Sequence, residues 1–389
     1  MNQTLESGPM ELHHPDMKNL VLNRKNNSNA LSILLSLISA SLLTPSSYAS
    51  PLNFHADDSD LSGERLGRGV FTAPSLQLKP DETTRNPITS GVEVSVQLLR
   101  KDGSKVPVSG LLFYSGNFEL RTDSEGNARL PECAPRSQFR LTAELKDSHF
   151  QVGEGSSTYR MTTSVDCGVR LELTFREESD GGQPLGIWRV ASKAKARLAE
   201  AIGLQFWSNP IEFVWPANGD YYSFGTVHLT RGDHWDVVGH EMGHGIYDLG
   251  KLGAFGGGSH KIDECYSEAL ALSEGWASYF SAWVNVDLTD SDAKFEFMVP
   301  RRAPLRFETI PGDVCNGPTN EWRVTGFLWD LVDFSTDNEA SEEPFSRLWR
   351  ALQGSRTSGA RSASRLFESA GIPRSVLDLV WDLNFRTPR

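Results

Sequence analysis

The chain is predicted to form a small all-β sandwich followed by an α+β domain with a helical C-terminal lobe. Two patterns predict this fold class. Between residues 91 and 176, short apolar runs alternate with period two and are separated by turn residues, which is typical of a β-sandwich. From residue 185 onward, apolar residues recur at three- and four-residue steps, which is typical of amphipathic helices. The 389 residues are enough for two or three domains.

Residues 1–49 are predicted to be a signal peptide. A positively charged stretch precedes an apolar run at residues 30–43, which is too short to span a bilayer comfortably. Small residues precede a predicted cut after Ala49. Met17 is an alternative start, because residues 1–16 carry acidic side chains ahead of the positive stretch. An uncleaved membrane anchor is the alternative interpretation. We therefore expect an exported protein, periplasmic or extracellular, without a membrane contact after cleavage.

Charge and cysteine content narrow the function classes. The formal net charge of −12 argues against nucleic acid and anionic membranes as main partners. The four cysteines of an exported chain predict disulfides, for which three pairings are possible. We favour Cys133–Cys167 and Cys265–Cys315, because each pair then lies within one predicted domain. On the loop-entropy model each disulfide stabilises the fold by about 3–4 kcal/mol. The oligomeric state is not predicted.

The N-terminal elements follow from composition and alternation. Residues 50–90 are polar, with scattered Pro, Gly and Asp, which predicts a flexible arm. The sandwich is predicted at residues 91–176, and its first strand at 92–98 alternates with period two. Turn residues at 101–104 and 123–127 separate strands. The further predicted strands are residues 111–120, 139–145 and 169–175.

The second predicted domain spans residues 185–389 and follows a polar, glycine-containing linker at 177–184. Its first helix begins at Leu185. A glycine-rich loop at 250–259 precedes a long helix whose predicted N-cap is Asp263. Strands are predicted at 211–215 and 226–229. Helices are predicted at 235–247, 263–284, 322–332, 344–352, 360–370 and 374–383.

The pentapeptide His240-Glu241-Met242-Gly243-His244 indicates a metal site. In a helix, residues four apart lie on one face and one turn apart, so both imidazoles can bind one ion. Glu241 lies beside them and can act as a base toward a water molecule held by that ion. A surface helix with two solvated histidines is the alternative, but the flanking residues are apolar. Gly239 and Gly243 share one helix face and favour a close approach of a partner surface at Gly275 and Ala277.

A third protein ligand is expected, because a catalytic zinc usually takes three. The pattern with a third histidine close behind the pentapeptide is absent, since Tyr247 and Gly250 occupy the required positions. Glu274, in the segment Leu-Ser-Glu-Gly-Trp-Ala, is the strongest candidate. The rivals are Glu268, Glu264, Asp263 and His260.

The motif followed by a helix carrying Glu274 resembles the gluzincin zinc peptidases of the thermolysin-like clan. The resemblance implies a zincin-like catalytic domain with His240, His244 and Glu274 as zinc ligands and Glu241 as base. It covers about fifty residues of the chain. The chain departs from the family in its longer spacing to Glu274, in Ser278 where an aspartate often orients the first histidine, and in the absence of any histidine after His260. Residues 122–130 resemble a hairpin of immunoglobulin-like or transthyretin-like accessory modules.

These observations predict a zinc-dependent peptidase that uses one ion to hydrolyse peptide bonds of peptides or proteins. The strand at 226–230 is either a pairing edge for an extended substrate or an internal strand. The candidate residues for stabilising the oxyanion or binding substrate are Tyr247, Tyr266 and Arg323. A catalytically inactive zincin-fold binding protein and a zinc hydrolase of non-peptide amides or esters are the alternatives. The sequence does not predict endo- or exopeptidase action, side-chain preference, or whether the β-domain is a prodomain or a binding module.

Overall fold

The computed structural model describes residues 76–335 and 341–389. The predicted signal peptide and most of the predicted arm lie outside the described residues. The last part of that arm needs correction, because β1 (Gln77–Leu78) and β2 (Glu82–Pro87) are strands. β2 pairs antiparallel with β12 (Val169–Arg176) through its backbone, while all six of its side chains are exposed. A strand held by backbone bonds alone leaves no hydrophobic pattern in the sequence.

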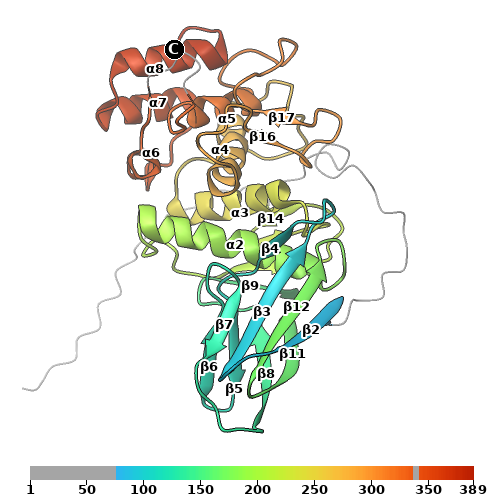
Figure 1. Cartoon of the computed structure of the whole chain (residues 1–389). Helices are drawn as coiled ribbons and strands as arrows, with labels where there is room; N and C mark the ends of the chain where they lie inside the picture. The colour runs from blue at the N-terminus through green and yellow to red at the C-terminus, as the bar shows by residue number, and fades with distance from the viewer. Residues whose placement is uncertain (1–75, 336–340) are drawn as a thin grey trace, which may run out of the picture. The chain divides into compact units, whose positions relative to one another are not determined.

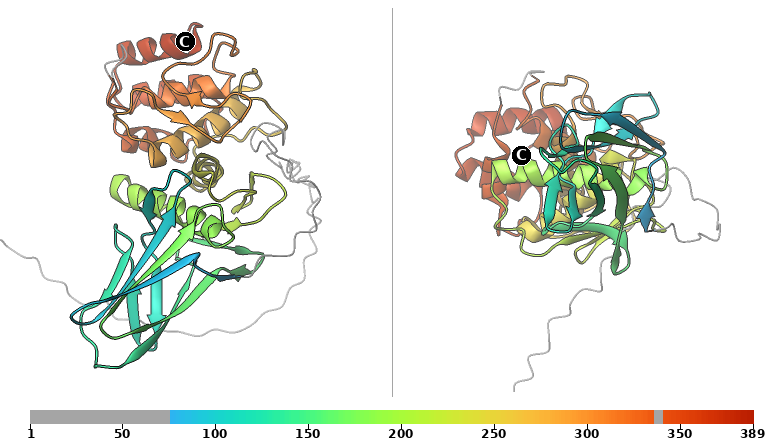
Figure 2. Two further views of the ribbon diagram at one scale, coloured as in Figure 1. Left: turned by 45° about the vertical axis from the view of Figure 1, so that its right-hand side comes forward. Right: turned by 60° about the horizontal axis from the view of Figure 1, so that its bottom comes forward.

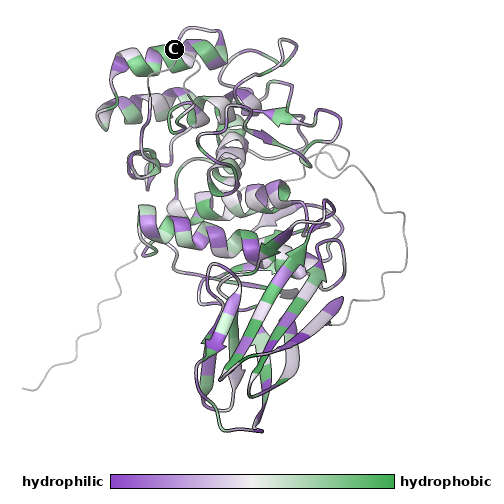
Figure 3. Ribbon diagram, in the orientation of Figure 1, coloured by the Kyte–Doolittle hydropathy of each residue, from purple (hydrophilic) through white to green (hydrophobic). Residues whose placement is uncertain are grey.

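Two five-stranded sheets build the N-terminal β-rich region (Figure 1). One has the order β1-β11-β8-β5-β6. The other has the order β2-β12-β3-β4, with β7 paired to β3. Hydrophobic and hydrophilic residues alternate along the strands (Figure 3), and the apolar side chains are buried in the core. The remaining strand bounds are β3 Val92–Leu99, β4 Lys105–Pro107, β5 Leu112–Ser115, β6 Phe118–Arg121, β7 Asn127–Leu130, β8 Gln138–Glu144 and β11 Arg160–Asp166.

A third sheet joins segments from both sides of the predicted linker. Its order is β10-β9-β13-β15-β14, and β9 (Phe150–Glu154) pairs in parallel with β13 (Ile211–Val214). The other members are β10 Ser157–Thr158, β14 Tyr221–Ser223 and β15 Thr226–His228. Within the predicted linker, α2 already begins at Gly182. The two predicted domains therefore share a sheet through β9, and their division stays a proposal.

The C-terminal part is mainly helical, as the apolar spacing predicted. Figures 1 and 2 show α2 (Gly182–Ala201) and α3 (Trp235–Gly250) beside each other, between the β-rich region and the later helices. The later elements are α4 Glu268–Asn285, β16 Lys294–Phe295, β17 Leu305–Arg306, α5 Glu321–Trp329, α6 Phe345–Leu352, α7 Ala360–Ser369 and α8 Arg374–Phe385. No helix among the described residues has both the length and the apolar character needed to cross a membrane.

The long predicted helix begins later than expected. α4 is capped by Ser267, whose hydroxyl accepts a hydrogen bond from the Leu270 N–H at 3.1 Å. Asp263, the predicted N-cap, instead accepts hydrogen bonds from Arg301 and Arg302. The three residues between the two positions remain outside the helix, because the cap that satisfies a first-turn N–H is Ser267.

Both predicted disulfides are confirmed. Cys133 bonds to Cys167 with a Cα–Cα distance of 5.9 Å, and Cys265 bonds to Cys315 with 5.7 Å. No free cysteine is found. The second bond joins the segment before α4 to the segment before α5.

Candidate metal centre

α3 turns the two motif histidines toward one point. His240 and His244 are both buried, and their Nε2 atoms lie 3.2 Å apart. The separation of four residues places the rings on one face of the helix, one turn apart. If both Nε2 atoms are unprotonated, they cannot hydrogen-bond to each other. A cation between them, by contrast, can accept both lone pairs.

α4 brings a carboxylate to the same point. Glu274 Oε2 lies 3.2 Å from His240 Nε2 and 3.1 Å from His244 Nε2. Ligands about 2.0–2.1 Å from a tetrahedral zinc lie about 3.3 Å from one another. The three separations therefore suit a single ion of this size, and the donor set of two imidazoles and one carboxylate suits zinc. The buried cluster formed by these three side chains could hold a metal ion.

His240 has the environment of a metal ligand. Its Nδ1 lies 3.0 Å from the hydroxyl oxygen of Ser278, which fixes the orientation of the ring. Burial lowers the pKa of His240 to about 4, so the imidazole is neutral near pH 7. A ligating histidine must be neutral. Ser278, four residues after Glu274, thus contacts the first histidine of the motif.

Glu241 differs from the ligands in its surroundings. It is buried, and its Oε2 has no hydrogen-bond partner among the described residues. Burial, reinforced by the negative charges of Glu274 and Asp220, raises the pKa of Glu241 well above its usual range. A buried carboxyl oxygen without a donor is costly unless a further group, such as a water molecule, binds there.

The structure adds two residues to this centre. His260 Nε2 lies 3.2 Å from Glu321 Oε2 and 3.7 Å from Glu274 Oε2, and all three side chains are buried. His260 comes from the glycine-rich loop and Glu321 from the first turn of α5. Sequence reasoning weighed His260 only as a ligand and missed Glu321, because an acidic residue after the N-cap Asn320 ordinarily serves the helix dipole. The burial of Glu321, which would have indicated a site residue, cannot be read from the sequence.

The three rival carboxylates lie elsewhere, whereas the fourth rival, His260, lies beside Glu274. Glu264 is exposed and pairs with Lys261 at 2.9 Å, and Glu268 pairs with Arg361 at 3.2 Å. Asp263 is held by the two arginines described above. Among the described residues, neither group that could hold a metal ion includes any of these three carboxylates.

The three oxyanion candidates differ in their surroundings. The Arg323 guanidinium donates to the carbonyl oxygens of Cys315, Asn384 and Val314 at 2.6–2.9 Å, so three of its donors are used within the fold. The Tyr247 hydroxyl donates to the carbonyl of Ala254 at 3.3 Å. The partly exposed Tyr266 donates to Glu264.

The strand at 226–230 is internal. β15 lies between β13 and β14, so β14 is the edge of the sheet. β14 packs against α3, where the Tyr222 hydroxyl donates to Asp248 at 2.7 Å. Asp248 follows His244 by one helical turn. The edge strand therefore runs alongside the metal-binding face of α3.

Residues 200–359 match a family model described as the mycolysin C-terminal domain. No curated protein matches the chain. The matched segment covers 160 of the 389 residues and contains His240, Glu241, His244 and Glu274, as well as His260 and Glu321. The match supports a thermolysin-like zinc metallopeptidase.

Proposed function

We propose that this chain is an exported, zinc-dependent peptidase that hydrolyses peptide bonds. The observation that carries this proposal is the convergence of His240, His244 and Glu274 at 3.1–3.2 Å beside the unsatisfied Oε2 of Glu241. The three residues would hold the ion. Zinc bound there would act as a Lewis acid that polarises the scissile carbonyl and acidifies the attacking water.

Glu241 is proposed as the general base. Its Oε2 takes a proton from the attacking water and delivers it to the leaving nitrogen. The raised pKa supports this role, because a carboxyl group that holds a proton between these two steps needs a higher pKa than a solvated glutamate. Burial also limits competing proton exchange with bulk water.

His260 is proposed to stabilise the developing negative charge of the carbonyl oxygen. Its Nδ1 lies 3.2 Å from the carbonyl oxygen of Gly258, and its Nε2 faces the carboxylates of Glu321 and Glu274. Nε2 is therefore the ring nitrogen that faces the metal centre, and Nδ1 faces the backbone of the loop. Glu321 orients the ring. This pair takes the place of the histidine that the family carries after its ligands.

The proposed substrate is an extended peptide that pairs with the edge strand β14. Tyr221–Ser223 presents a backbone edge next to the metal-binding face of α3. Adding a strand there would place a peptide bond near the metal centre. Export is supported by the two disulfides, which persist in oxidising compartments.

The Glu241→Gln variant tests the reaction. We expect peptide hydrolysis to fall on the order of 1,000-fold while bound zinc stays near one ion per chain, because a general base is lost and the ligands are intact. Casein digestion and metal analysis measure both. Glu200→Gln, at an exposed position of α2, is the matched control. Unchanged hydrolysis by Glu241→Gln, or a zinc-free purified protein, would rule out the peptidase proposal.

The His260→Gln variant tests the role proposed for His260 and Glu321. Losing one donor to the developing oxyanion should lower kcat on the order of 100-fold with a much smaller change in KM, because the interaction forms mainly in the transition state. Glu321→Gln should lower kcat by a smaller factor. Equal losses in kcat and zinc content would instead show that His260 supports metal binding.

A further inference from the structure

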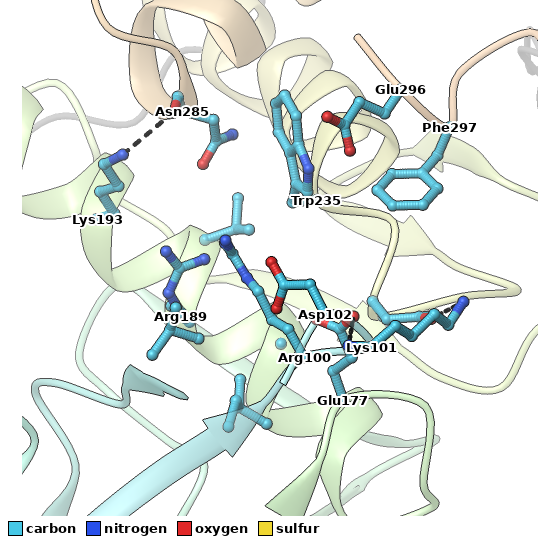
Figure 4. A pocket seen from close by; sticks show the side chains of 16 residues that line it. Arg100, Lys101, Asp102, Glu177, Arg189, Lys193, Trp235, Asn285, Glu296 and Phe297 are labelled. Atoms are coloured by element: carbon cyan, nitrogen blue, oxygen red, sulfur yellow. Dashed lines mark hydrogen bonds and ion pairs between the residues drawn. The ribbon is translucent and has the colours of Figure 1, made fainter. Parts of the chain in front are cut away.

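A cavity lies beside the start of α3, and none of the metal-centre residues line it. Its volume is about 430 Å³, which falls in the range of small-molecule sites. The turn after β3, the outward face of α2, the first turn of α3 and the segment after β16 form its walls (Figure 4). The proposed peptidase reaction makes no use of this cavity.

Four cationic residues line the cavity, and one of them, Lys101, forms an ion pair with Asp233 at 3.9 Å. The other three lie on one side. Arg189 and Lys193 follow each other on one face of α2, and Arg100 approaches them from the end of β3 (Figure 4). Within the described part of the chain, the guanidinium groups of Arg100 and Arg189 make no hydrogen bond and no ion pair. The Lys193 ammonium donates to the backbone carbonyl of Asn285 at 3.4 Å.

Three of the four acidic residues that line the cavity interact with other partners. Asp233 forms a two-bond pair with Arg231 at 2.7 and 2.8 Å. Glu177 accepts the backbone N–H of Lys101 at 3.3 Å, and Asp102 accepts that of Ser104 at 2.8 Å. Glu296 lies on the opposite wall beside Phe297 (Figure 4). In the described part of the chain no ion pair joins Arg100, Arg189 or Lys193 to a carboxylate, although the negative charge of Glu177 acts on Arg189 and Arg100.

Neighbouring charges affect Lys193. Partial desolvation of its ammonium group, and after it the positive charges of Arg189, Arg197 and Arg100, lower the pKa of Lys193 to about 8, while the negative charge of Asp287 opposes the shift. A cluster of like charges destabilises the fold unless an anion neutralises it. Arg197 does not share the cavity, because its guanidinium lies over the Trp283 ring.

The facing wall carries two aromatic side chains beside Glu296. Trp235 and Phe297 are half-buried there and leave part of their rings to the cavity. Guanidinium groups bind the planar or tetrahedral oxygens of carboxylates and phosphates through paired hydrogen bonds. Aromatic rings favour an apolar, planar body. The two walls together select a ligand with an anionic head and an apolar body.

We infer that this cavity binds a small organic anion, with a phosphate or carboxylate head on Arg100, Arg189 and Lys193 and an apolar body against Trp235 and Phe297. The site is separate from the metal centre, and its ligand is distinct from the proposed peptide substrate. The inference therefore stands or fails independently of the peptidase proposal.

Isothermal titration of the full chain with phenyl phosphate, benzoate and inorganic phosphate, at constant ionic strength, tests the site. We expect one saturable site per chain. The stronger of the two aromatic ligands identifies the head group, and phenyl phosphate should bind at least fivefold more tightly than inorganic phosphate. Arg189→Gln should weaken binding at least tenfold. Lys193→Gln should weaken it about threefold, because an ammonium group contributes a point charge rather than paired hydrogen bonds.

Arg365→Gln is the control, because Arg365 is an exposed cation on α7. It should leave binding unchanged. The inference is overturned if none of the three ligands gives saturable binding, if Arg365→Gln weakens binding as much as Lys193→Gln, or if inorganic phosphate binds as tightly as phenyl phosphate.

Discussion

α3 carries two buried carboxylates, Asp236 and Glu241, whose hydrogen bonds indicate different roles. Burial raises the pKa of both Asp236 and Glu241. Asp236 Oδ2 accepts the backbone N–H groups of Glu296, Phe297 and Met298 at 2.7–3.2 Å, so it anchors that segment to the start of α3. Glu241 keeps an oxygen without a partner among the described residues. Hydrogen-bond satisfaction, rather than pKa alone, identifies the reactive group.

His234 predicts an acid-sensitive step in stability. Burial lowers the pKa of His234 to about 4 from an ordinary 6.5, and its ring stacks on Phe297 at the N-terminus of α3. The unfolded chain therefore binds a proton that the folded chain excludes. The stability contribution is complete above pH 6.5 and is lost as pH falls through 4.

The His234→Gln variant should lose less stability on acidification, by on the order of 2 kcal/mol between pH 7 and pH 4, after allowance for partial exposure. Urea unfolding of both proteins at several pH values measures the difference. Identical pH dependence of the two proteins would contradict the role assigned to this ring.

At the scale of elements, glycine brings α3 and α4 close enough for Glu274 to meet the two histidines. A Cβ atom at Gly243 would lie 2.8 Å from the Cα and carbonyl oxygen of Ala277. Gly275 has the same function toward α5, where its Cβ would lie 2.6 Å from Val324. Gly243 therefore meets the partner Ala277 as expected, whereas Gly275 faces a different helix.

Gly243→Ala should destabilise the protein by about 2 kcal/mol or more and lower its zinc content. Alanine ordinarily stabilises a helix interior by about 1 kcal/mol relative to glycine, but here the overlap is with backbone atoms that cannot rotate away. Thermal unfolding and metal analysis measure both effects. Gly312→Ala is the control, because nothing lies within 4 Å of its added Cβ. A Gly243→Ala protein as stable as this control would show that α4 can shift without cost.

At the scale of the whole molecule, the sequence predicted the helices and the motif that have local patterns. It did not predict contacts between segments that are distant along the chain. The period of apolar residues predicted α3 and α4, and the motif predicted that α3 carries two ligands. β14 has only three residues, too few for an alternation, so the sheet edge was not predictable. The pairing of His260 with Glu321 and the sharing of a sheet through β9 join distant segments, which no local pattern encodes.

The disulfide Cys265–Cys315 connects the two segments that carry this pair. Cys265 follows His260 in the segment before α4, and Cys315 precedes Glu321 in the segment before α5. The backbone N–H of Cys315 also donates to the carbonyl of Asp263 at 2.9 Å. Cys133–Cys167 lies in the β-rich region, far along the chain from the metal centre.

Replacing both cysteines of a disulfide by alanine should therefore lower stability in either case but lower activity in only one. Each loss should cost about 4 kcal/mol of unfolding free energy, because the closed loops of 34 and 50 residues constrain the unfolded chain to a similar extent. Under conditions where both variants remain folded, removing Cys265–Cys315 should lower kcat, since His260 and Glu321 lose their shared restraint. Removing Cys133–Cys167 should leave kcat near that of the unmodified protein. Urea unfolding and peptide hydrolysis measure the two quantities, and equal kcat values for the two variants would show that the α4–α5 packing alone positions the pair.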